Sequence, residues 1–207
     1  MFRRIRVVAG GSTLGWAALL GMTVALLGAG TAGAGAKTNA SIYTPFNSLG
    51  KPAGPVTKTV QGSCFTGSIA VAHERAWRCM SGNLLYDPCF STPNANGIVL
   101  CTATGPWSSS LIKITLTKKL PTKFANKGKP SMSGIPWALI TTSGWKCGLI
   151  TGATTSLGGE RLNYVCKGTQ DGLWGGPIRN HEPWTIYAAI PHAKKLSKTV
   201  AIKSAWF

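Results

Sequence analysis

Hydrophobic and polar residues alternate with a period of two in several short segments of the chain. The clearest examples are residues 112–117, 162–167, 184–188 and 200–206. Because successive side chains of a strand point to opposite faces, each segment predicts a strand with one buried and one solvated face. Turns between the strands are predicted at glycine-containing pairs, namely Ser143-Gly144, Gly158-Gly159 and Asp171-Gly172.

Only one segment favours a helix, residues 74–80, which would end at Gly82-Asn83. No repeat of 20 to 50 residues recurs, which argues against a solenoid or a propeller. The sequence therefore predicts a mostly β protein. We expect a single antiparallel β domain, sandwich-like or barrel-like, with one short helix and disulfide bonds.

Residues 1–36 have the pattern of an export signal. Three arginines precede position 7, an apolar run of 14 residues covers 14–27, and Ala34-Gly35-Ala36 offers small residues for signal peptidase. Cleavage there would make Lys37 the first residue of the mature protein. A retained membrane anchor is the alternative, although such an anchor needs about 20 apolar residues. We expect a secreted or extracytoplasmic protein, or one tethered to the membrane by an uncleaved segment.

The rest of the chain divides by composition. Residues 37–61 are rich in proline, glycine, threonine and serine and lack periodicity, so we expect a flexible arm. Residues 62–207 contain all the strand patterns and all the cysteines, and we expect them to form the disulfide-bonded β domain.

The chain has six cysteines, an even number, and export would place them in an oxidising environment. No C-x2-4-C pair is present, which disfavours a structural zinc site. Six cysteines allow 15 pairings and the sequence does not choose among them. Pairing between neighbours along the chain is the simplest solution: Cys64 with Cys79, Cys89 with Cys101, and Cys147 with Cys166.

Five sequence blocks follow one another in the chain: GSCFTGSIAVAHERAWRCMSGNLLYDPCF from Gly62, PWAL from Pro136, GWKC from Gly144, RLNYVC from Arg161 and PWTI from Pro183. Together they resemble an uncharacterised group of exported, cysteine-containing domains from actinobacteria and related Gram-positive bacteria. The resemblance implies a bacterial extracytoplasmic domain. The group has no assigned activity, so it implies no functional residue.

The charge is strongly unbalanced, with 22 lysines and arginines against five acidic residues and a net charge of +17. No acidic residue lies between positions 88 and 159. A basic surface favours adhesion to polyanions, although it can also serve solubility alone. The lysines we expect to bind are Lys113, Lys118, Lys119, Lys123, Lys127 and Lys129. We expect the partner to be an anionic cell-wall or membrane-surface polymer, or another exported protein, and not nucleic acid.

The sequence offers few groups for catalysis. G-x-S-x-G, H-E-x-x-H and P-loop motifs are absent, so we predict no catalytic residue, no metal ligand and no cofactor. His73-Glu74 and His181-Glu182 are the remaining candidates, because each joins a base to an acid. We therefore favour a non-enzymatic binding domain. The alternative is a small secreted hydrolase of cell-wall polysaccharide or peptide that uses His73, Glu74 or Glu182.

Seven tryptophans follow the export signal, and two of them, Trp145 and Trp174, lie beside predicted turns. Exposed aromatic rings near lysines could stack on sugars or bases, whereas core packing is the ordinary use of tryptophan. An immunoglobulin-like sandwich is a further alternative for the fold. It would use Tyr164 as a tyrosine corner and a disulfide between Cys101 and Cys166.

Overall fold

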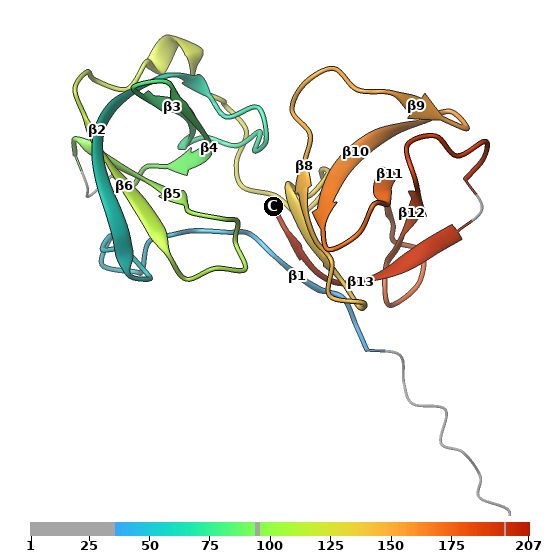
Figure 1. Ribbon diagram of the computed structural model, residues 1–207. Helices are drawn as coiled ribbons and strands as arrows, with labels where there is room; N and C mark the ends of the chain where they lie inside the picture. The colour runs from blue at the N-terminus through green and yellow to red at the C-terminus, as the bar shows by residue number, and fades with distance from the viewer. Residues whose placement is uncertain (1–35, 94–95, 197) are drawn as a thin grey trace, which may run out of the picture. The chain divides into compact units, whose positions relative to one another are not determined.

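The computed structural model describes residues 36–93, 96–196 and 198–207 (Figure 1). The predicted export signal lies outside the described residues, apart from Ala36. No helix within the described part of the chain is both long enough and apolar enough to span a membrane.

Five consecutive strands form a closed barrel. Its strand order is β2-β3-β4-β5-β6, and β6 returns to pair with β2 in parallel, whereas the other neighbours are antiparallel. Closure leaves no strand of the barrel with an unpaired edge. The strands are β2 (Val56–Gly67), β3 (Ala76–Ser81), β4 (Leu84–Phe90), β5 (Ile98–Thr102) and β6 (Leu111–Leu116).

The remaining strands form a second sheet with the order β1-β13-β12-β11-β10-β8-β7, and β9 pairs with β10. An additional pairing between β13 and β7 closes the path, so this sheet is also barrel-like. The strands are β1 (Asn39–Ser41), β7 (Ala138–Thr141), β8 (Lys146–Leu149), β9 (Ser156–Leu157), β10 (Glu160–Lys167), β11 (Gly172–Ile178), β12 (Thr185–Ala189) and β13 (Lys198–Trp206).

The predicted fold class is confirmed, and the period-two segments are strands. Ile114 in β6, Ile186 and Ala188 in β12, and Ile202 in β13 are fully buried, as the alternation requires. β10 departs from strict alternation, because a bulge between Leu162 and Tyr164 turns Asn163 inward as well. The buried Asn163 amide donates to the Gly175 carbonyl at 2.8 Å, so its polar group is satisfied.

The prediction of a helix over residues 74–80 is wrong, because this segment enters β3. Trp77 and Cys79 are buried, whereas Met80 is exposed, so the segment follows the period of a strand. Pairing with β2 and β4 on both sides decides its conformation over local propensity. The described residues contain one helical element, the 3-10 turn η1 (Thr122–Phe124).

The prediction that residues 37–61 form a flexible arm is also wrong. Thr38 is only 4 % exposed, and its hydroxyl donates to the Ile202 carbonyl at 2.8 Å. β1 then pairs in parallel with β13. Phe46 is buried in a core cluster, and β2 begins at Val56. The low apolar content of this segment predicted flexibility. The Thr38 hydrogen bond, the pairing of β1 and the burial of Phe46 instead hold the segment against the rest of the protein.

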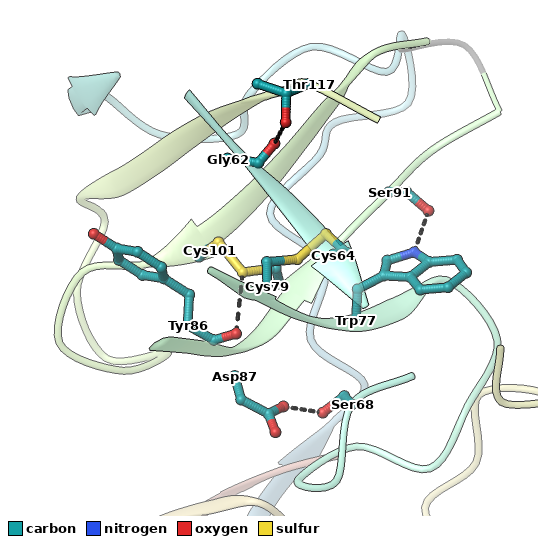
Figure 2. The surroundings of a disulfide bond; sticks show 11 residues. Gly62, Cys64, Ser68, Trp77, Cys79, Tyr86, Asp87, Ser91, Cys101 and Thr117 are labelled. Atoms are coloured by element: carbon teal, nitrogen blue, oxygen red, sulfur yellow. Dashed lines mark hydrogen bonds between the residues drawn. A yellow bond between two sulfur atoms is a disulfide. The ribbon is translucent and has the colours of Figure 1, made fainter. Parts of the chain in front are cut away.

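The disulfides in the structure are Cys64–Cys79, Cys89–Cys101 and Cys147–Cys166, which are the three local pairs favoured by the sequence. Each joins residues that face one another across two antiparallel neighbours. The four barrel cysteines belong to one buried cluster, and Figure 2 shows Cys64, Cys79 and Cys101 together beside Trp77. These bonds indicate an oxidising, extracytoplasmic environment.

The pairing excludes the immunoglobulin-like alternative, because Cys101 bonds to Cys89 and not to Cys166. Tyr164 instead donates its buried hydroxyl to the Pro136 carbonyl at 2.6 Å. This bond holds the chain immediately before Trp137.

Candidate binding surface

Five of the six predicted binding lysines lie on one segment, residues 117–137 between β6 and β7, which we call the lysine-bearing connection. All five are exposed: Lys118, Lys119, Lys123, Lys127 and Lys129. Lys113 is separate from them. It lies within β6, half-buried, between Thr59 of β2 and Leu100 of β5. The structure therefore gathers five of the candidates and leaves Lys113 out.

The lysine-bearing connection is held by hydrogen bonds to the segment that follows β2. The Asn126 side-chain amide donates to the main-chain carbonyls of Ser68 and Val71 at 2.8 and 2.9 Å. The Glu74 N–H donates to the Gly128 carbonyl at 2.6 Å. A Cβ on Gly128 would lie 2.9 Å from the Ala72 carbonyl oxygen, so this approach requires glycine. The lysines are thus carried by a segment in a defined place.

Gly128 pairs with His73, which begins a tight turn over residues 73–76. Arg75 in this turn has a φ of 67°, the only positive φ of a non-glycine residue within the described residues. The left-handed conformation costs an L-residue about 1–2 kcal/mol, and glycine would avoid that cost. This backbone outlier makes Arg75 a candidate functional residue.

Arg75 lines a groove of about 860 Å³ at the barrel, together with Lys118 and Lys119. We call this the basic groove. Among the described residues, no carboxylate lines it. Within the described residues, none of its three cations forms an ion pair. Its walls combine hydroxyl and aliphatic groups, including Ser91, Thr92, Thr117, Thr122, Ile98 and Leu120.

His73 lines a different cavity of about 440 Å³, which we call the histidine cavity. Trp137 and Leu149 form part of its wall, and Lys129, Ser131 and Ser133 of the lysine-bearing connection line it too. His73 and Trp137 are 9 % and 5 % exposed. Phe90 packs between them, with ring centroids 6.0 Å from His73 and 6.4 Å from Trp137. No acidic side chain from residues 36–93, 96–196 or 198–207 lines this cavity.

Asp87 has a structural role. It lies inside β4. Its carboxylate accepts a hydrogen bond from the Ser68 hydroxyl (Figure 2) and another from the Ile69 N–H. Arg78 lies 3.8 Å away, and burial raises the pKa of the Asp87 carboxyl above its ordinary value. Asp87 therefore fixes residues 68–71, which form part of the wall of the histidine cavity.

The His–Glu pairs of the sequence do not form catalytic pairs. His73 Nδ1 lies 2.6 Å from the main-chain carbonyl of Glu74, and the Glu74 side chain is not among the groups lining the cavity. The Glu182 carboxylate accepts the Thr38 N–H at 2.9 Å. His181 lies 3.0 Å from the Pro183 carbonyl. Within the described residues, no three metal-ligating side chains gather.

The tryptophans beside turns are not exposed platforms. Trp174 is fully buried, and its indole N–H donates to the Ala189 carbonyl at 3.1 Å. Trp145 is half-buried, with the Lys198 ammonium 5.2 Å from its ring centroid. Sequence reasoning singled out neither Arg75 nor Trp137 as binding residues. Arg75 is a candidate because of the strained turn that holds it, and Trp137 because it lines the same cavity as His73. Neither the turn nor the cavity can be recognised in the sequence.

No protein-family model matches the chain, and comparison with curated proteins and with solved structures gives no match.

Proposed function

We propose that this protein is an exported, non-enzymatic domain that binds an anionic cell-surface polymer through the basic groove. The observation that carries the proposal is the groove itself. Arg75, Lys118 and Lys119 line one large cavity, and no carboxylate of the described part of the chain lines it. The other lysines of the same connection extend the positive surface beyond the groove.

Electrostatics favours a polyanion as the ligand. Cations that lack acidic neighbours create a positive potential that attracts and orients negative chains. The hydroxyl groups of Ser91 and Thr122 can donate to phosphate or carboxylate oxygens at the same time as the cations bind them. The groove is also large enough for part of a polymer, since ligand pockets are typically about 300–1,000 Å³.

Export supports the assignment to the cell surface. Three disulfides indicate an oxidising compartment. The pattern of residues 1–36 is typical of an export signal, and the sequence blocks described above resemble exported bacterial domains. We infer that the protein is released, or held at the membrane by an uncleaved signal, and meets the wall polymer there.

The test is binding of the oxidised, exported chain to purified cell wall over a salt series. The variant K118Q/K119Q removes two groove cations. K194Q/K195Q is the matched control, because Lys194 and Lys195 are also adjacent, exposed lysines and do not line the groove. We expect the affinity of the wild type to fall steeply as the salt concentration rises. Binding releases counterions from the polymer, and this release is less favourable at high salt.

K118Q/K119Q should bind more weakly and with a shallower salt dependence. The slope of log affinity against log salt should fall by up to about one per lost contact on a densely charged polymer. The control pair should stay closer to the wild type. Equal losses in the two variants would show that only net charge matters, and binding that ignores salt would overturn the proposal in favour of a protein partner.

A further inference from the structure

We propose that the histidine cavity binds a hydroxyl-bearing sugar or polyol unit of the polymer, whose anionic groups occupy the basic groove. The identity of the polymer rests on the function proposed above. The chemistry of the cavity rests on separate observations, namely two buried polar atoms that lack partners and the walls around them.

His73 presents a hydrogen-bond acceptor. Its Nδ1 lies 2.6 Å from the Glu74 carbonyl oxygen, which can only accept, so Nδ1 is the donor of this contact and Nε2 is the nitrogen left to accept. Nε2 then has a free lone pair. This atom is buried and has no hydrogen-bond partner within the described residues.

Trp137 presents the complementary donor. The indole Nε1–H can only donate, and it too is buried without a partner in the described part of the chain. Buried polar groups are rarely left unpaired, because the loss of water costs about 1–3 kcal/mol for each group. One cavity therefore has an unused acceptor and an unused donor on residues that line it.

Hydroxyl groups suit both atoms, since a hydroxyl can donate to Nε2 and can equally accept from the indole N–H. A phosphate diester or a carboxylate only accepts, so it would leave His73 unpaired. An ammonium group only donates, so it would leave Trp137 unpaired. The pair of atoms therefore selects neutral hydroxyl-bearing groups over ions of either sign.

The other walls fit a sugar ring or a polyol chain. Ile69, Ile135 and Leu149 offer apolar surface to C–H groups. Ser131 and Ser133 bring hydroxyl oxygens that lie 2.8 Å from each other. Lys129 lines the same cavity and can meet a negative substituent on the unit that enters.

The turn over residues 73–76 links the two sites. His73 lines the histidine cavity and Arg75 lines the basic groove, although only one residue separates them. Two residues of chain span at most about 7 Å between their Cα atoms. A polymer with hydroxyl groups and negative charges in alternation can therefore contact both residues at once.

The test uses neutral probes at high salt, so that ion contacts are screened. Glucose, N-acetylglucosamine and glycerol are titrated into the oxidised, exported chain up to tens of millimolar. Binding is followed by the NMR signals of the Trp137 indole N–H and of the Val71 and Ile135 amides. We expect saturable shifts of these signals with at least one neutral probe and none with dimethyl phosphate, a phosphate diester that can only accept hydrogen bonds.

His73→Leu removes the acceptor, and Trp137→Phe keeps an aromatic ring while removing the donor. Each should lower the affinity for the neutral probe about tenfold, as expected for one lost hydrogen bond. K118Q/K119Q should keep that affinity and lose wall binding. The amide spectrum shows that each variant is folded, and if His73→Leu does not fold, Trp137→Phe decides alone.

No shift with any neutral probe, or shifts with dimethyl phosphate alone, would overturn this inference. Wall binding through the groove would then still stand, because it is measured at low salt with separate variants. Conversely, sugar binding without salt-sensitive wall binding would retain the cavity as a sugar site and reject the proposed polyanion.

Discussion

Removal of the Cys147–Cys166 disulfide tests how the second sheet is stabilised. The bond joins β8 to β10 across 19 residues, and Cys147 is fully buried. In the chain-entropy model, opening a loop of this size gives the unfolded chain freedom equivalent to about 3 kcal/mol at 25 °C. The double variant C147A/C166A should lose about that much unfolding free energy in urea titrations. Its melting temperature should fall by about 6–12 °C.

The Cys89–Cys101 disulfide is the control, because it joins neighbouring antiparallel strands in the same way across only 12 residues. Replacing both partners by alanine removes two sulfur atoms in each case. The difference between the two variants therefore isolates loop length. The logarithmic dependence predicts that they differ by only about 0.4 kcal/mol. A loss under about 1 kcal/mol in either variant, or a difference above about 2 kcal/mol, would refute this reasoning.

Three further substitutions test contacts around the histidine cavity. Tyr164→Phe leaves the Pro136 carbonyl without its buried donor, so unfolding free energy should fall by about 1–3 kcal/mol in urea; an unchanged value would show that water replaces the hydroxyl. Because burial raises the Asp87 pKa, the folded state keeps that proton at pH values where the unfolded chain has lost it. Stability should therefore fall as pH rises from about 4 through the raised pKa, and Asp87→Asn should flatten this part of the profile; an opposite slope would reverse the assignment. The Arg179 guanidinium donates to the carbonyls of Met132 and Gly134 at 2.7 and 2.5 Å and so holds one wall of the histidine cavity. Lysine cannot make both bonds in this geometry, so Arg179→Lys should weaken binding of the neutral probe several-fold in the NMR titration. An unchanged affinity would show that Arg179 is not needed to hold this wall in place.

The sequence predicted what depends on local pattern. The period-two segments form strands because the hydrophobic face of each strand is buried in a core. Ile114 and Ile186 are examples of such buried side chains. The cysteine pairs followed from their spacing, because each pair lies on strands that are neighbours in the sheet. The closing pairs, β2 with β6 and β13 with β7, were not predictable, because they join segments far apart in the chain.

Local propensity failed where distant contacts decided the conformation. The sequence of residues 74–80 does not favour a strand. Pairing with β2 on one side and β4 on the other imposes the strand conformation on residues 76–80. Residues 37–61 read as a flexible arm, but the Thr38 hydroxyl and main chain find partners at Ile202 and Glu182. The candidate site was not predictable from the sequence either. Arg75 stands out only through its positive φ, and Trp137 only through an indole N–H that has no partner within the described residues.

The order of the disulfides has a consequence for how the chain matures. Each cysteine is joined to the next one along the sequence, first with second, third with fourth, and fifth with sixth. A chain that is exported amino end first presents its thiols to the oxidising side in this same order. If the oxidant of the outer compartment takes two electrons from each successive pair of thiols as it emerges, the native connectivity forms directly. Such a protein should reach its native pairing without a catalyst that rearranges wrong bonds.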